Sequence, residues 1–423
     1  MSQIKVLVYP AGEINSIELH DALSTCVNIK LFGASSIDRH GEYVFENYIR
    51  NAPMITDKDF FEKFNALLAT NEIELIFPTH DTIAAFFADN QEKIKAKIIT
   101  ADKKTSAICR DKEKTYSTFN SHDFVPQVYT EITTYPLFIK PKQGQGSVGA
   151  KLIKNAKDIA DINLTDYVIC EYLPGEEYTV DCLTDKNGKL SFASPRSRQR
   201  IMAGISVAGK IEKLTPEIEN IAQKINGELS FMGLWWFQIK RDEEGKWKLL
   251  EISTRCAGTM CLTRARGVNL PLLSVYVALG YDIEVHPNSY RVVVDRTLIS
   301  RYKIDYEYDT VYFDFDDTLI INNKVNLKAI WFLYQCKNIG KKVILITKHQ
   351  NELVQTMKTF AITENLFNEI IHLKPHEIKA DFVKNNKAIF IDNAFQERNM
   401  IMKVHNIPVF DVDGIDVLMD WRS

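Results

Sequence analysis

Apolar and amphipathic stretches alternate along the first 125 residues of the chain. Short apolar runs at 4–10, 28–33 and 73–79 have the length of buried strands. The stretches at 15–24 and 57–70 have the polar and apolar spacing of amphipathic helices. This alternation is typical of a parallel sheet with helices on both faces. We therefore predict an α/β domain at the start of the chain.

From residue 137 the pattern changes to short strands separated by glycine-containing turns. A helix is expected at 215–229, followed by two strands at 234–241 and 247–253 that the turn DEEGK joins. The pattern predicts an α+β region with an antiparallel sheet. The earlier strand-like pieces of this region lie at 137–141, 151–154, 167–173, 178–184 and 189–194.

The last part of the chain returns to the first pattern. Residues 283–308 have no strong periodicity and contain Pro287, so they are interpreted as a connector. From residue 310 strands and helices alternate again, which predicts a second parallel, doubly wound sheet. Its expected strands are 310–316, 341–347, 388–392 and 407–412, around helical stretches at 328–340 and 351–360.

Composition narrows the class of protein. The 423 residues are 45% hydrophobic and 25% charged, which fits two or three folded domains with sizeable cores. A net charge of -3 gives no electrostatic reason to expect nucleic acid. No apolar run reaches the ~18 residues needed to cross a bilayer, and the first run is too short for a signal peptide. Seven scattered cysteines without CxxC spacing indicate reduced thiols in a cytoplasmic protein, without structural zinc.

The motif DFDDTLI at 314–320 directly follows a predicted strand. Asp314 and Asp316 are separated by one residue where the chain leaves the sheet, so both carboxylates can point the same way. Together they can share a hard cation, which prefers oxygen ligands. Asp314 is the candidate ligand and nucleophile, and Asp316 is the candidate acid that later activates water.

Two further strand ends carry polar side chains. Thr347 ends the strand at 341–347, and Asp392 ends the strand at 388–392. Because the carboxyl ends of parallel strands meet at one crevice, these side chains should lie near the DFDDT motif. Lys374 and Lys379 lie between them in sequence, and either could steady a phosphoryl group.

With these motifs in this order, the segment from about residue 308 to residue 423 resembles the haloacid dehalogenase superfamily. The resemblance implies that Asp314 forms an aspartyl-phosphate, while Asp316 acts as acid and base. It also implies that Thr347 and a lysine hold the phosphate, and that Asp392 completes a magnesium site with the other two aspartates.

Three details qualify this resemblance. Lys379 is favoured over Lys374, because it starts the helix that leads into the last motif. Asn393 stands where the family often has a second aspartate. The short segment 319–340 leaves no room for a large cap domain, so the crevice is expected to be open.

A glycine-containing loop follows the strand LFIKP. Lys140 lies at the strand's end, and the loop carries Gly144, Gly146, Ser147 and Gly149. Glycines let backbone N–H groups approach an anion closely, and a lysine neutralises it. The loop differs from the pattern GxxxxGK[ST], which disfavours a P-loop kinase. On its own it fits a plain hairpin as well as a nucleotide site.

Further along, Gln238 and Glu251 lie on the two adjacent strands of the expected hairpin. Their oxygens could bind one or two magnesium ions that bridge the phosphates of ATP. Arg255 follows four residues after Glu251, where it could meet a transferring phosphoryl group.

With these features, the segment from residue 1 to about residue 285 resembles the ATP-grasp superfamily, in particular the branch that contains the large subunit of carbamoyl phosphate synthetase. The resemblance implies that Lys112, Lys140 and the loop residues Gly146 and Ser147 contact the phosphates of ATP. It implies that the backbone from Glu171 to Leu173 binds adenine and that Glu176 or Glu177 reaches the ribose. It implies magnesium ligands at Gln238, Glu251 and Ser253, with Ser253 in the place of the family's usual asparagine.

The segment SPRSRQRIMAG concentrates Arg196, Arg198 and Arg200. At spacing two on an extended strand they would share one face. They form either a solvated basic edge or a clamp for an acyl-phosphate or acidic co-substrate, since guanidinium groups match carboxylate and phosphate. His80, at the end of an expected strand, either contacts substrate or is an ordinary loop histidine.

The two resemblances together imply a bifunctional, magnesium- or manganese-dependent enzyme. An ATP-dependent ligase would join small carboxylate and amine substrates through an acyl-phosphate, and a phosphatase would act on a phosphorylated substrate or product. The predicted segments are a Rossmann-like pre-ATP-grasp domain (1–110), an ATP-grasp domain (111–285), a connector (286–308) and a haloacid dehalogenase-like domain (309–423).

Two other functions are the alternatives to this prediction. A nucleic-acid end-processing phosphatase would need a kinase P-loop or a basic face, and the sequence has neither. An ATP- or metabolite-sensing regulatory protein is supported only by Ser253 and Asn393. No nucleic-acid or membrane partner is expected, and a homodimer is left open.

Overall fold

The computed structural model describes residues 3–37, 39–160, 162–202 and 204–422. It divides into two compact units, Met1–Leu298 and Ile299–Ser423, which we call unit 1 and unit 2. Within the described residues, no helix is both long enough and apolar enough to span a bilayer. All seven cysteines are free thiols, and five of them are buried. The finer boundaries at residues 110, 285 and 308 stay predictions.

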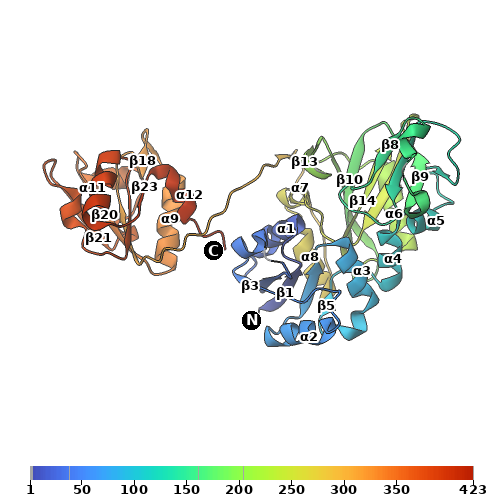
Figure 1. Ribbon diagram of the computed structural model, residues 1–423, viewed down its shortest axis with the longest axis horizontal. Coiled ribbons are helices and arrows are strands. Elements are labelled where there is room, and N and C mark those ends of the chain that lie inside the picture. Colours follow the sequence, from blue (N-terminus) through green and yellow to red (C-terminus); the bar gives the residue numbers. More distant parts are fainter. Residues whose placement is uncertain (1–2, 38, 161, 203, 423) are drawn as a thin grey trace. The chain divides into compact units, whose positions relative to one another are not determined.

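Unit 1 begins with a five-stranded parallel sheet in the order β3-β2-β1-β4-β5. Successive residues of β1 are buried on opposite faces, so both faces need cover. Val6 and Val8 pack with α1 and α8, whereas Leu7 and Tyr9 pack with α2 and α3 (Figure 1). The predicted α/β start of the chain is confirmed. The strands are β1 (Ile4–Tyr9), β2 (Ile29–Ala34), β3 (Asn47–Ile49), β4 (Leu75–Pro78) and β5 (Lys97–Ile98), and the helices are α1 (Ile14–Leu23), α2 (Phe60–Thr70), α3 (Asp81–Asp89) and α8 (Leu270–Ala278).

Two short helices lead from this sheet into the next part of unit 1. They are α4 (Lys103–Arg110) and α5 (Lys112–Thr118). The Asp102 carboxylate accepts a hydrogen bond from the first turn of α4, and the Asp111 carboxylate does the same for α5. These caps satisfy N–H groups that have no partner within the helix. They fix Lys112 as the first residue of α5.

The middle of unit 1 contains two antiparallel sheets, as the α+β pattern predicted. One has the order β6-β9-β7-β8 and the other the order β11-β10-β14-β15. Helix α6 (Pro216–Glu228) covers one face of the second sheet by packing Ile221 and Ile225 against Trp235 and Phe237. The strands are β6 (Val128–Tyr129), β7 (Leu137–Pro141), β8 (Lys151–Ile153), β9 (Tyr167–Glu171), β10 (Glu177–Thr184), β11 (Leu190–Ser197), β14 (Gly233–Arg241) and β15 (Trp247–Ser253).

A small three-stranded sheet completes unit 1. It pairs β12 (Arg200–Met202) with β13 (Ile205–Lys210), and β13 with β16 (Val293–Asp295). Strand β16 lies inside the segment expected to be a plain connector, where the sequence shows no strand periodicity. Helix α7 (Cys261–Ala265) precedes α8.

Unit 2 is a second five-stranded parallel sheet, in the order β21-β20-β17-β22-β23. Helices cover both faces, because Val311 and Phe313 pack with α9 and α10 whereas Tyr312 packs with α11. Between β17 and α9 the chain forms only the hairpin β18–β19 in this fully described stretch. The strands are β17 (Thr310–Phe313), β18 (Ile320–Ile321), β19 (Lys324–Val325), β20 (Lys342–Thr347), β21 (Glu369–His372), β22 (Ala388–Ile391) and β23 (Val409–Phe410), and the helices are α9 (Leu327–Asn338), α10 (Leu353–Thr359), the 3₁₀ helix η6 (Lys379–Phe382), α11 (Phe395–His405) and α12 (Ile415–Leu418).

Candidate functional site

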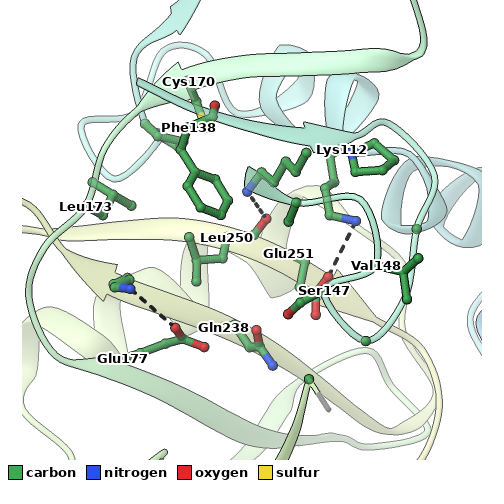
Figure 2. A pocket seen from close by; sticks show the side chains of 18 of the residues that line it. Lys112, Phe138, Ser147, Val148, Cys170, Leu173, Glu177, Gln238, Leu250 and Glu251 are labelled. Carbon is green, nitrogen blue, oxygen red and sulfur yellow. Dashed lines mark hydrogen bonds and ion pairs between the residues drawn. The ribbon is translucent and has the colours of Figure 1, made fainter. Parts of the chain in front are cut away.

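A cavity in unit 1 lies beneath the glycine-containing loop between β7 and β8. The ends of β7 and β9 and the hairpin β14–β15 form its other walls. Phe138, Leu173 and Leu250 gather at one end of it, and polar side chains at the other (Figure 2). Every residue that the sequence predicted for ATP binding lines this cavity: Lys112, Lys140, Gly146, Ser147, Glu171, Leu173 and Glu177.

The loop keeps its shape through left-handed backbone conformations. Gly146 and Ser147 have φ values of 62° and 59°, and Gly149 has a φ of 78°. The loop also lies against a second glycine, since a Cβ added at Gly204 would be only 2.0 Å from Gly146 O. The position of the loop over the cavity therefore depends on the lack of a side chain at residue 204.

Two lysines bring positive charge to the polar end of the cavity. Lys140 Nζ donates a hydrogen bond to Leu250 O at 3.0 Å and lies over the ring of Tyr116. Burial lowers the pKa of Lys140, because the ammonium has left water. Lys112 Nζ lies 3.5 Å from Glu251 Oε2. An anion in the cavity would offset the cost of burying these cations.

Gln238 and Glu251 face each other across the hairpin. They are register partners in the pairing of β14 with β15, as the sequence predicted. Both line the cavity, so an amide oxygen and a carboxylate can reach one ion there. Ser253, two residues after Glu251, is buried, and its hydroxyl donates a hydrogen bond to Asp81 Oδ1 at 2.7 Å.

The residues predicted to bind adenine and ribose lie at the other end. Glu171 ends β9, and its side chain accepts a hydrogen bond from Gln127 N at 2.8 Å. Glu177 begins β10 between two cations, 2.5 Å from Arg198 Nη1 and 3.7 Å from Lys240 Nζ. Glu177, rather than Glu176, is the one of the two alternatives that lines the cavity.

A second cavity adjoins the first and shares Gln238, Glu251 and Gly146 with it. Its wall carries Trp236 and three arginines as hydrogen-bond donors, and Glu13, Glu251 and Gln145 as acceptors. Among the described residues, the buried atoms Trp236 Nε1, Arg198 Nε and Arg255 Nε have no hydrogen-bond partner. Because a buried donor without a partner costs free energy, this wall is suited to an acceptor-rich ligand.

The structure separates the three arginines of the SPRSRQR segment. Arg196 is buried and bonds Asp181 through Nε and Nη2 at 2.9 and 3.0 Å. Arg198 reaches Glu177, whereas Arg200 is exposed in β12 and pairs with Asp295 at 2.6 Å. The three do not all share one face, because Arg200 belongs to β12, which is in a different sheet from β11. Arg196 and Arg198 line the second cavity, and Arg200 is not among its lining residues.

His80 and Arg255 lie near each other at the N-terminus of α3. His80 caps this helix by accepting a hydrogen bond from Thr82 N at 3.2 Å, and it is not among the residues that line the two cavities. Burial lowers its pKa. Arg255 lines the second cavity and donates to Asp81 Oδ2 at 2.8 Å.

In unit 2, the carboxyl ends of three neighbouring strands bring the predicted residues together. Asp314 follows β17, Thr347 ends β20 and Asp392 follows β22. β17 pairs with both of the other strands in parallel, so the three ends converge. Thr318 Oγ1 donates to Asp314 Oδ2 at 3.2 Å and accepts from Asn393 N at 3.1 Å.

Lys379 binds two of the aspartates at once. Its Nζ lies 2.5 Å from Asp314 Oδ1 and 2.6 Å from Asp392 Oδ2, and all three side chains are buried. Lys374, the alternative lysine, is exposed. Burial and the neighbouring Asp392 raise the pKa of Asp314 to about 7, and burial raises the pKa of Asp392. Burial opposes the charged form of Lys379, but the two carboxylates outweigh it and raise its pKa.

Asp316 lies apart from this group. Its half-exposed carboxylate is 2.8 Å from His349 Nδ1 instead of facing Asp392. Among the described residues, no three His, Cys, Asp or Glu side chains converge where they could hold a metal ion. The predicted cluster of three aspartates is thus formed by two of them, with Lys379 between.

Comparison with known proteins bears on unit 1. A family model described as "ATP-grasp in the biosynthetic pathway with Ter operon" matches residues 163–298. A pyruvate carboxylase variant from Rhizobium etli is 14% identical with a TM-score of 0.56, and the match covers 67% of this chain but 29% of the carboxylase. No curated protein matches the chain in sequence.

Two further solved structures are similar along most of their own length. N5-carboxyaminoimidazole synthetase from Staphylococcus aureus, complexed with ADP, is 16% identical with a TM-score of 0.56, and the match covers 68% of this chain and 80% of that one. An L-amino acid ligase from Bacillus licheniformis is 15% identical with a TM-score of 0.51, and the match covers 66% and 74%. Unit 1 has the ATP-grasp fold.

Within the ATP-grasp unit, sequence reasoning missed two groups that hold the predicted residues. Asp81 accepts hydrogen bonds from both Ser253 and Arg255. Burial alone would raise the pKa of Asp81, but these hydrogen bonds and the positive charges of Arg255 and Arg110 outweigh burial and lower it. Arg110 donates to Gly144 O at 3.3 Å and so supports the glycine-containing loop. Asp81 directly follows the candidate residue His80, but its partners Ser253 and Arg255 are more than 170 residues away in sequence.

Proposed function

We propose that unit 1 is an ATP-dependent ligase that activates a carboxylate as an acyl-phosphate and transfers the acyl group to a nucleophile such as an amine. The observation that carries this proposal is the Gln238–Glu251 pair, which lies on the wall shared by the two cavities. A phosphoryl group bound between the cavities would have the candidate magnesium ligands Gln238 and Glu251 on one side and the guanidinium group of Arg255 on the other.

The first cavity suits ATP. The apolar side chains of Phe138, Leu173 and Leu250 offer contact to a purine ring (Figure 2). Glu177 lies where it could accept hydrogen bonds from ribose hydroxyls. Lys112 and Lys140 lie at the opposite end, beneath the glycine-containing loop, and would neutralise the phosphates.

Magnesium fits the donor set of the shared wall. Gln238 and Glu251 supply amide and carboxylate oxygens, the ligands that Mg²⁺ prefers, and phosphate oxygens and water would supply the rest. Such an ion would neutralise charge on the phosphates. Ser253 donates its hydroxyl proton to Asp81, which leaves its oxygen lone pairs for a cation, but it is not among the residues that line the two cavities.

The second cavity suits the acid to be activated. A carboxylate has acceptor oxygens for the partnerless donors of Trp236, Arg198 and Arg255. One of its oxygens would attack the γ-phosphorus as the bond to ADP breaks. The amine would then attack the acyl carbon, and the C–O bond to phosphate would break to release inorganic phosphate.

The ligase proposal is tested by measuring ADP release across a panel of carboxylate and amine substrates. We expect one pair to stimulate release, and Lys140→Ala and Glu251→Gln each to lower turnover at least about 100-fold. Lys154→Ala, an exposed lysine just after β8, serves as the control and should behave like the wild type. Unchanged ATP affinity and turnover in both site variants would refute the assignment.

For unit 2 we propose a magnesium-dependent aspartyl phosphatase. The observation that favours it is the buried group of Asp314, Asp392 and Lys379, which carries one more negative than positive charge when ionised. A cation therefore fits there electrostatically, and Asp314 lies beside it as the nucleophile. Thr347 lies at the neighbouring strand end, where it could bind a phosphate oxygen.

The phosphatase proposal is tested with p-nitrophenyl phosphate. We expect magnesium-dependent hydrolysis that EDTA removes and that Asp314→Asn abolishes while ligase turnover persists. Asp305→Asn, an exposed carboxylate upstream of β17, is the matched control. Normal hydrolysis by Asp314→Asn would show that Asp314 is not the nucleophile.

A further inference from the structure

The carboxylate of Asp316 is held by a histidine that is itself fixed on several sides. Asp316 is 51% exposed, whereas the side chain of His349 is 8% exposed. His349 Nδ1 lies 2.8 Å from Asp316 Oδ1 and 3.1 Å from Oδ2, so one ring nitrogen faces both carboxylate oxygens. An exposed carboxylate would otherwise sample several rotamers in water.

Four contacts hold His349 in place. Its backbone N–H donates to Thr347 Oγ1 at 3.1 Å, and its backbone carbonyl accepts from His372 Nε2 at 2.7 Å. Its ring packs edge-on against Phe315, with centroids 5.3 Å apart. Its second ring nitrogen, Nε2, lies 2.9 Å from Thr356 Oγ1. The ring can thus neither swing away nor turn over without losing several interactions.

The direction of these hydrogen bonds gives His349 Nδ1 its role. Thr356 Oγ1 either donates to Glu352 O at 3.1 Å and accepts from His349 Nε2–H, or it donates to Nε2 of a ring whose proton is on Nδ1. A neutral ring has an acceptor at Nδ1 in the first case and a donor there in the second. The contact between Nδ1 and the Asp316 carboxyl group therefore contains one proton, whichever of the two atoms carries it.

We propose that His349 is a positioning residue of the phosphatase site, which aims the Asp316 carboxyl group at the leaving oxygen. The proposal rests on the phosphatase function proposed for unit 2. Asp314 attacks phosphorus, the ester P–O bond breaks, and the leaving oxygen takes the proton from Asp316. Water then attacks the aspartyl-phosphate and gives a proton to Asp316, which releases phosphate and restores Asp314.

This role predicts an effect that depends on the leaving group. p-Nitrophenolate leaves readily without a proton, whereas an alkoxide needs one. In the full-length chain, we expect His349→Phe to lower kcat/KM for glycerol 2-phosphate by about 10- to 100-fold and kcat/KM for p-nitrophenyl phosphate by less than about 3-fold. The ratio kcat/KM is the quantity to compare, because it reports the step in which the leaving group departs and not the later attack of water, which is common to both esters. His349→Asn, whose amide can donate from the position of Nδ1, should restore part of the loss. His376→Ala, an exposed histidine of the same unit, should leave both rates unchanged.

An equal loss of activity on the two esters would show that His349 has only a structural role. That result would overturn the inference and leave the phosphatase proposal intact. Failure of the wild type to hydrolyse either ester would remove the phosphatase proposal and this inference with it. Thermal melting of each variant shows whether a loss of rate reflects unfolding.

A second measurement does not depend on turnover. In ¹⁵N-histidine-labelled protein, one pair of ring-nitrogen signals should vanish in His349→Phe. The same pair should shift in Asp316→Asn and in Thr356→Val, because each change removes a partner of one ring nitrogen. Signals unaffected by Asp316→Asn would show that the contact is absent in solution and would overturn the inference.

Discussion

At the scale of single residues, burial rather than sequence spacing decides what each arginine of the SPRSRQR segment does. Arg196 and Asp181 are 2% and 0% exposed, and Thr263 Oγ1 also donates to Asp181 at 2.8 Å. Removing one partner of such a pair leaves a buried charge without compensation. The pair therefore stabilises the fold of β10 and β11 in addition to lining the second cavity.

We predict that Arg196→Met lowers the free energy of unfolding by about 3–5 kcal/mol. Arg200→Met is the matched control, since its exposed pair with Asp295 should contribute about 0–1 kcal/mol. Urea unfolding of unit 1 measures both values. The double variant Arg196→Met/Asp181→Leu should recover part of the loss, because no unpaired charge remains buried. Equal effects of the two single variants would contradict this account.

The sequence could indicate residues whose partners are close along the chain or fixed by a strand's end. Gln238 and Glu251 meet because a short turn sets the register of their hairpin. Asp314 and Asp392 meet because parallel strands end at the same edge. Asp81 and Arg255 are 174 residues apart, and nothing in local periodicity links them. His349 was missed because its partner lies in a different strand-end motif.

At the scale of elements, the strands and helices follow the apolar periodicity, but loop positions depend on contacts between distant elements. The alternating patterns predicted both parallel sheets and the hairpin β14–β15. Strand β16 was not predicted, because it is short and mostly exposed. It pairs only with β13, at the edge of their sheet. The glycine-containing loop was predicted, whereas its contact with Gly204 requires the folded β12–β13 hairpin.

We predict that Gly204→Ala raises the KM for ATP by about 10-fold, since a Cβ at residue 204 would push the loop at Gly146 away from the cavity. Gly188→Ala is the control for backbone strain. Its φ of 81° is similar to the 76° of Gly204, but a Cβ there meets no atom within 4 Å. Both variants should lose stability in thermal melting, and Gly204→Ala should lose at least as much as Gly188→Ala because its Cβ also meets backbone atoms. A KM for ATP that rises equally in both would show that strain alone is responsible.

At the scale of the whole molecule, each unit has hydrophobic cores of its own. The core clusters of unit 1 are built from its three larger sheets and the helices packed on them, and those of unit 2 from the helices and strands on both faces of its parallel sheet. The sequence indicated this division through the return of the β-α-β pattern at residue 310. It could not assign residues 286–298, because β16 joins a sheet that is formed earlier in the chain.

Separate cores predict that the units fold separately. Fragments 1–298 and 299–423 should each unfold cooperatively, and the melting curve of the full chain should be the sum of their two transitions. Fragment 299–423 should keep its p-nitrophenyl phosphatase kcat within about 2-fold, because the strand ends that carry Asp314 and Asp392 belong to its own sheet. A fragment cut within unit 1, ending at residue 285, is the matched control. It lacks β16 and should leave β13 with an unpaired edge and a lower melting temperature. A fragment 299–423 that remains unfolded alone would show that the cores of unit 2 are not sufficient for its stability.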